Sequence, residues 1–147
     1  MKMLQIIIAT AGITALGCSQ RLAVSNVPSL VQNSLKTQFP AAANIEWDKQ
    51  GNSFEAEFDL NQTEHTALLD ATGKILMYKH DVDTTQLPEP VMSSIKRDFA
   101  AYVVDDLEKV EKDGQTFYQV ELESSSNQDL TKVFAQDGTQ SSISYWD

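Results

Sequence analysis

The chain has 147 residues, enough for one ordinary domain or for two small units that share a core. Its 21 acidic residues outnumber its 11 Lys and Arg, which gives a formal net charge of -10 at pH 7. The length excludes a large multidomain enzyme, and the acidic balance makes nucleic acids and anionic membranes poor partners. Because the acids are spread along the chain, we expect a folded domain with an acidic surface.

The first residues predict export. The segment "MKMLQIIIATAGITALGC" carries one Lys, then an apolar run too short to span a membrane, then small residues before Cys18. We interpret residues 1–17 as a signal peptide and residues 18–26 as a tether. "ALGC" resembles the lipobox of bacterial lipoproteins, which implies lipid attachment at Cys18, and ordinary cleavage after Gly17 is the alternative. Cys18 is the only cysteine, so no intramolecular disulfide can form.

The rest of the chain contains two copies of one pattern. Residues 27–40 ("VPSLVQNSLKTQFP") align without gaps with residues 87–100 ("LPEPVMSSIKRDFA"), and apolar residues recur every four positions in both. This spacing, with proline near the start, predicts an amphipathic helix of about three turns in each copy. We assign residues 27–84 to the first repeat and residues 85–147 to the second.

Each predicted helix is followed by segments in which apolar and polar residues alternate, such as "NSFEAEFDL" in the first copy and "QTFYQVELE" in the second. We therefore predict an α+β fold of two tandem repeats, each with one helix followed by a four-stranded antiparallel meander. Both helices should pack on the sheet face that carries Phe54, Phe58, Tyr118 and Leu122. The predicted strands are residues 45–49, 53–60, 63–70, 74–79, 107–112, 116–123, 130–135 and 140–146.

The first repeat also carries a recurrent set of motifs, namely Val27-Pro28, Phe39-Pro40, Ile45-Glu46-Trp47, "FEAEF" from Phe54 to Phe58, and Asp70 with Gly73. This pattern resembles the PepSY-like, β-lactamase-inhibitor-like family of periplasmic proteins. The resemblance implies a helix-plus-four-strand repeat in an exported, often lipid-anchored protein, and kinship of fold with secreted β-lactamase inhibitors. It supplies no catalytic motif. The second copy departs from it, since Ala100 replaces the second proline and no tryptophan matches Trp47.

Glu55 and Glu57 are candidates for general acid–base catalysis, because strand geometry places them on one face about 7 Å apart. Such a pair needs one member with a pKa raised by burial in a cleft, and an open acidic sheet face predicts no cleft. We therefore favour a solvated strand face and predict no catalytic residue.

The two histidines, together with Asp81 and Asp83, are candidates for a metal site. If residues 71–73 form a three-residue turn, His65 pairs with Lys79, and His80 then lies on the opposite sheet face. The histidines would not converge, so we predict no metal and no other cofactor.

We interpret the chain as a non-enzymatic periplasmic binding module whose open sheet face recognises an envelope protein or peptide, with a basic partner favoured. Inhibition of an envelope or secreted protein follows from the resemblance only as an analogy of fold. Membrane contact is expected only through Cys18, and the sequence specifies no oligomeric state. The alternatives are a small hydrolase or metal-dependent enzyme on the same sheet, and a passive structural domain. The candidate interaction residues are Trp47, Glu55, Glu57, Asp59, Phe117, Glu121, Glu123, Tyr145 and Trp146.

Overall fold

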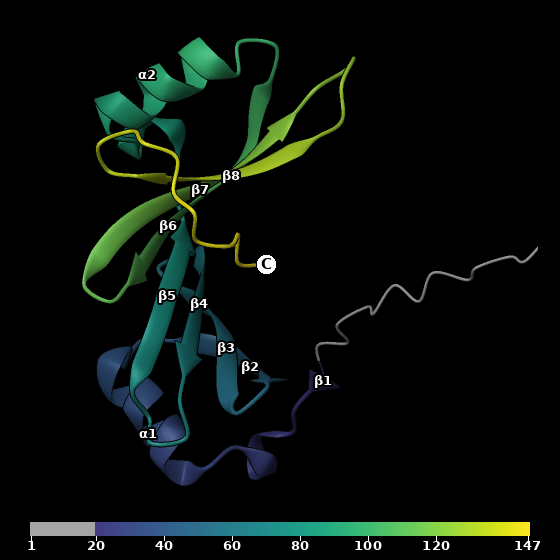
Figure 1. Ribbon diagram of the computed structural model, residues 1–147. Coiled ribbons are helices and arrows are strands. Elements are labelled where there is room, and N and C mark those ends of the chain that lie inside the picture. The colour runs from purple at the N-terminus through teal and green to yellow at the C-terminus, as the bar shows by residue number, and fades with distance from the viewer. Residues whose placement is uncertain (1–19) are drawn as a thin grey trace, which may run out of the picture.

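The structure, a computed structural model, describes residues 20–147 as one antiparallel sheet with two α-helices (Figure 1). The predicted signal peptide and Cys18 lie outside the described residues. The eight strands are hydrogen-bonded in chain order, which confirms the α+β class with an antiparallel sheet. None of the helices in the described part has the length and apolarity that a membrane span requires.

The elements follow one another twice in a similar order. In the first half they are β1 (Gln20–Arg21), the 3-10 helix η1 (Val24–Asn26), α1 (Ser29–Gln38), β2 (Ala43–Gln50), β3 (Ser53–Leu60), β4 (Thr63–Leu69) and β5 (Ile75–Asp81). In the second half they are the 3-10 helix η2 (Thr84–Gln86), α2 (Glu89–Asp98), β6 (Val103–Lys112), β7 (Gln115–Glu123) and β8 (Leu130–Ala135). The expected tether thus contains an edge strand, because β1 pairs with β2.

The two helices begin directly after Pro28 and Pro88. At the start of a helix a backbone N–H has no partner within the helix, so the N–H that proline lacks costs no hydrogen bond. Each is two residues shorter at both ends than the predicted spans of 27–40 and 87–100. The predicted apolar stripes are confirmed, since each helix buries two aliphatic residues against the sheet. These residues are Val31 and Leu35 in α1, and Val91 and Ile95 in α2.

Both helices cover the same face of the sheet. Phe54 and Phe58 lie in the core beneath α1, and Tyr118 and Leu122 lie in the core beneath α2, as predicted. Cross-strand partners share a sheet face, and so do residues two apart in a strand. One row of such partners joins the two cores and consists of Ala56, Ala67, Tyr78, Glu111 and Thr116. The sheet twists between the cores, so α1 and α2 lie at opposite ends of the molecule (Figure 1).

The two halves repeat one contact between helix and turn. Ser34 Oγ in α1 donates a hydrogen bond to the carbonyl of Gly73 (2.5 Å), and Ser94 Oγ in α2 donates one to the carbonyl of Gly138 (2.7 Å). Gly138 has a φ of +83°, and a Cβ there would lie 2.3 Å from the Pro90 carbonyl oxygen. The close approach of this turn to α2 therefore requires glycine.

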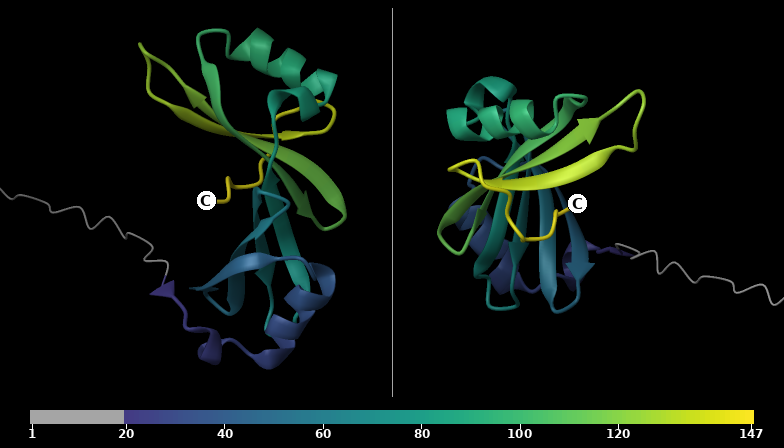
Figure 2. Two further views of the ribbon diagram at one scale, coloured as in Figure 1. Left: turned by 180° about the vertical axis from the view of Figure 1, so that it is seen from behind. Right: turned by 45° about the horizontal axis from the view of Figure 1, so that its top comes forward.

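The second half has three strands after its helix, so the predicted strand at 140–146 is wrong. Gln140 bridges to Phe134, and the Ser141 N–H donates to the Val133 carbonyl (2.7 Å), but the pairing then stops. Residues 141–147, which we call the C-terminal tail, return across the sheet face opposite the helices. Both views of Figure 2 show the chain end beside the middle of the sheet. The tail leaves the edge because Ile143, Tyr145 and Trp146 pack on Val110, Phe117 and Val133 of that face.

Candidate functional site

The sheet face opposite the helices, which we call the acidic face, collects carboxylates from most of the strands. Asp48 lies opposite Glu55 in the first half, and Asp106 lies opposite Glu121 in the second. The two halves share this face because β5 and β6 pair directly. Its acidic residues are Glu46, Asp48, Glu55, Glu57, Asp59, Glu64, Asp81, Asp106, Glu108, Glu121 and Glu123.

Exposed acids concentrate at one end of the acidic face. In an antiparallel sheet the last residues of one strand lie beside the first residues of the next, so β3, β5 and β7 end where β4 and β6 begin. Burial, followed by the negative charges of Asp106, Glu108 and Glu64, raises the pKa of Asp81 there. The carboxylates at this end therefore repel one another. We call the exposed ones that form no ion pair the carboxylate rim: Asp59, Glu64, Asp81, Asp106 and Glu123.

Two hollows open beside the rim. One has a volume of about 240 Å³ and combines four acidic residues with two leucines. The other has a volume of about 210 Å³ and combines four acidic residues with Phe58. A wall that is both apolar and acidic suits a Lys or Arg side chain, whose aliphatic stem and cationic head need different surroundings. The acidic residues are Asp105, Glu121, Glu123 and Asp129 in the first hollow, and Glu46, Glu57, Asp59 and Glu64 in the second.

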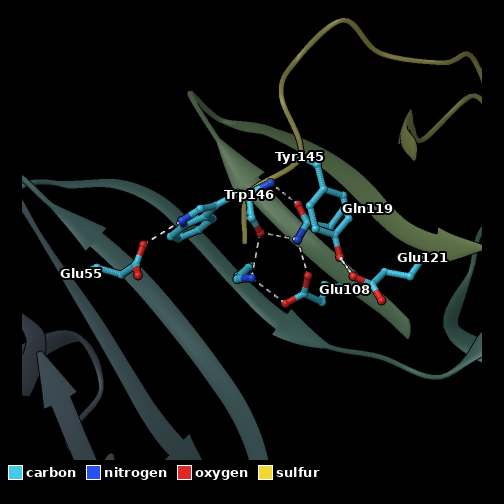
Figure 3. Close-up of polar contacts among 7 residues, drawn as sticks. Glu55, Glu108, Gln119, Glu121, Tyr145 and Trp146 are labelled. Atoms are coloured by element: carbon cyan, nitrogen blue, oxygen red, sulfur yellow. Dashed lines mark hydrogen bonds and ion pairs between the residues drawn. The ribbon is translucent and has the colours of Figure 1, made fainter. Parts of the chain in front are cut away.

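The centre of the acidic face is covered by Trp146 of the C-terminal tail (Figure 3). The Trp146 backbone N–H donates to Gln119 Oε1 (3.1 Å), and its carbonyl accepts from Gln119 Nε2 (2.8 Å) and Lys79 Nζ (2.9 Å). The indole Nε1 donates to Glu55 Oε2 (2.8 Å). The predicted open face is therefore wrong at its centre, where the chain covers itself.

Beneath the tail lies a buried polar network. Lys79 and Glu108 are each 7% exposed and form an ion pair of 2.9 Å, and Gln119 donates a second hydrogen bond to Glu108. Such charges are tolerated in an interior only when they are paired and hydrogen-bonded. The network therefore anchors the tail over the centre of the acidic face and leaves the carboxylate rim exposed.

A family model described as "Putative beta-lactamase-inhibitor-like, PepSY-like" matches residues 18–77 and 60–139. The chain belongs to this PepSY-like family. Among curated proteins, none matches the sequence.

Solved structures from Bacteroides share the PepSY-like fold. A DUF2874 family protein from Bacteroides uniformis is 20% identical with a TM-score of 0.72, over 77% of this chain and 85% of that chain. A structure from Bacteroides eggerthii, described as "putative periplasmic proteins", is 21% identical with a TM-score of 0.73, over 78% and 85%. A BLIP-like protein from Bacteroides fragilis is 22% identical with a TM-score of 0.67, over 81% and 92%. At these identities the likeness shows the fold.

In this PepSY-like chain most of the predicted interaction residues lie on the acidic face or in the tail that covers it. The placement of Trp47 there is wrong, because Trp47 is 3% exposed and lies in the core beneath α1. Phe117 is also buried, under the tail. The structure brings Glu55 to Trp146, and Tyr145 donates a hydrogen bond to Glu121 (3.3 Å). Glu57, Asp59 and Glu123 lie on the acidic face, as predicted.

Sequence reasoning missed the residues that complete this face: Asp48, Lys79, Glu108 and Gln119. Each stands at an alternating strand position, which was the available signal. What the pattern did not contain was the pairing of β5 with β6 across the repeat boundary, which brings these side chains together.

The predicted separation of the histidines is wrong. The turn forms as expected, with the Asp70 N–H donating to the Lys74 carbonyl (3.0 Å), but a bulge follows: Leu69 pairs with Ile75 and Leu68 with Met77. This one-residue shift places His80 directly opposite His65, with ring centroids 5.2 Å apart. Both rings face the helix side, and Asp81 lies on the acidic face. They therefore do not form a metal site with Asp81.

Proposed function

We propose that this PepSY-like protein is a non-enzymatic, exported module that binds a basic segment of an envelope protein or peptide along the carboxylate rim. The observation that carries the proposal is the concentration of exposed, mutually repelling carboxylates beside two hollows of mixed apolar and acidic lining. A basic partner relieves this repulsion and places its Lys or Arg side chains in the hollows. Attraction of this kind speeds encounter and weakens as salt rises.

The family and its structural relatives support this proposal. The family description names β-lactamase-inhibitor-like proteins, and the Bacteroides fragilis relative is called BLIP-like, so inhibition of an envelope or secreted protein is the form of binding that we propose. The description of the Bacteroides eggerthii relative as periplasmic supports export. We further propose that Cys18 carries a lipid anchor.

The test is capture of envelope proteins by the purified protein and by a variant with a reversed rim, Asp59→Lys with Asp106→Lys. Both positions are exposed, so the fold should tolerate the changes. We expect the variant to lose at least about tenfold of the basic proteins that the wild type captures at about 0.1 M salt, because attraction becomes repulsion. The readout is quantitative mass spectrometry of the bound fraction.

A matched control reverses two charges away from the rim, Asp98→Lys at the end of α2 with Glu111→Lys on the helix side of β6. This control changes the net charge by the same amount and should capture the same proteins as the wild type. Equal capture by the wild type and the rim variant would show that the rim does not bind these proteins. An equal loss of capture in both variants would show that net charge, and not the rim, determines binding.

A further inference from the structure

Three carboxylates converge on the acidic face at the β2–β3 pair. None of them belongs to the carboxylate rim, but Glu57 also lines the second hollow beside it. Asp48 lies directly opposite Glu55, and Glu57 follows two residues later on the same face. One oxygen from each of the three side chains lies within 4.8 Å of the others. At that spacing a single cation between the three side chains could contact all of them.

These carboxylates have no cationic partner among the residues that the structure describes. Arg21 lies opposite Asp48 in the β1–β2 pair but forms its ion pair with Glu46. Lys79 forms its ion pair with Glu108. Asp48 and Glu55 are only 7% and 4% exposed, so water gives them little compensation. Buried like charges of this kind are costly unless an opposite charge lies between them.

Asp48 supplies a second observation. Its Oδ1 is buried and accepts no hydrogen bond from any described residue. Buried carboxylate oxygens nearly always have a partner, and a cation bound by the three carboxylates would supply the one that this atom lacks. Glu55 differs, because the indole N–H of Trp146 fixes its Oε2 and thereby orients the carboxylate.

We propose that Asp48, Glu55 and Glu57 bind a Ca²⁺ ion beneath the edge of the C-terminal tail. The donors are all carboxylate oxygens, which selects a hard cation over zinc or copper. Three carboxylates offer up to six oxygens in irregular geometry, which suits the flexible coordination of Ca²⁺ better than the strict octahedron of Mg²⁺. Trp146 couples the site to the tail through Glu55.

The experiment is thermal unfolding of the purified protein with CaCl₂, at an ionic strength matched with NaCl, with Trp fluorescence followed in parallel. At about 10 mM Ca²⁺, roughly ten times the Kd of weak extracellular Ca²⁺ modules, the wild-type Tm should rise by about 4 °C. The emission of Trp146 should change over the same concentration range, because its indole contacts a ligand side chain.

The site variant Asp48→Asn with Glu55→Gln should lose both responses. It replaces repelling carboxylates with amides of the same shape, so its Tm without Ca²⁺ should equal or exceed that of the wild type. A missing response therefore cannot come from misfolding. The matched control, Asp106→Asn with Glu123→Gln, removes two exposed charges from the rim of the same face and should keep the full response.

The inference is overturned if Ca²⁺ leaves the wild-type Tm unchanged at matched ionic strength, or if the site variant responds as the wild type does. An equal rise with MgCl₂ would overturn the assignment to Ca²⁺. The experiment uses the purified protein without a partner, and its site variant changes only Asp48 and Glu55, which line neither hollow beside the rim. Its failure is therefore distinguishable from a failure of the proposed function.

Discussion

Among single residues, His65 and His80 should control the pH dependence of stability. Burial lowers the pKa of His65, and burial together with the charges of His65 and Lys109 lowers the pKa of His80. In the unfolded chain both groups titrate near pH 6.5. Just below that pH the two histidines bind protons in the unfolded chain, whereas in the folded protein they stay neutral until the pH falls further. The stability present above about pH 6.5 is therefore lost as the pH falls through the lowered pKa values.

We predict that the free energy of unfolding falls more steeply between about pH 7.5 and about pH 5 in the wild type than in His80→Phe. Phenylalanine keeps the ring contacts with His65 and Tyr78 but removes one titrating group and its charge. Urea unfolding monitored by circular dichroism at each pH measures the difference. Because both proteins carry the same carboxylates, parallel pH profiles would contradict the assignment to the histidines.

This histidine pair also shows where prediction from sequence ends at the residue scale. The alternation predicted strands at residues 63–70 and 74–79, close to the observed β4 and β5, and the glycine at 73 predicted the turn. The bulge at Leu76, where Leu69 pairs with Ile75 and Leu68 with Met77, has no comparable signal in the sequence pattern. A register shift of one residue reverses every face that follows, so correctly predicted strands still placed His80 on the wrong face.

At the scale of elements, the C-terminal tail should contribute to stability through Trp146. We predict that Trp146→Phe lowers the free energy of unfolding by about 2 kcal/mol, since the buried Glu55 carboxylate loses its indole donor. The change in the urea unfolding midpoint measures this. Tyr145→Phe is the matched control in the same tail; its hydroxyl bond to Glu121 is longer, at 3.3 Å, and its loss should be smaller. Equal stability of Trp146→Phe and wild type would contradict the anchoring role.

The same tail shows why the helices and seven strand positions were predictable but the last strand was not. Helical stripes and strand alternation are local patterns, and each is buried by its own half of the sheet. Residues 140–146 also alternate, but Ser141 and Ser142 bring nothing apolar to the core beneath α2. The aromatic residues that follow find Val110, Phe117 and Val133 on the opposite face, an apolar patch that exists only after β6, β7 and β8 have paired.

For the whole molecule, the net charge was evident in the sequence, but its concentration on one face was not, because that requires the register of every strand pair from β2 to β7. Directly opposed residues have Cβ atoms about 5 Å apart, well inside the Debye length of ~10 Å at 0.1 M salt. Repulsion within the acidic face therefore acts against folding at low salt, and added salt screens it.

Salt also weakens the attraction within ion pairs. Whether added salt raises or lowers the Tm therefore depends on whether the repulsion between carboxylates or the attraction within ion pairs is larger. The exposed or half-exposed ion pairs among the described residues are Arg21–Glu46, Arg97–Asp98 and Lys109–Glu111, and ion pairs this open to water contribute little to stability. The opposed carboxylates outnumber them, and we predict that the Tm rises as NaCl increases from about 0.05 to about 0.5 M. Differential scanning fluorimetry across that range measures the slope. Asp59→Asn with Asp106→Asn should reduce the slope, and a Tm that falls with salt in the wild type would show that ion pairs outweigh the repulsion of the acidic face.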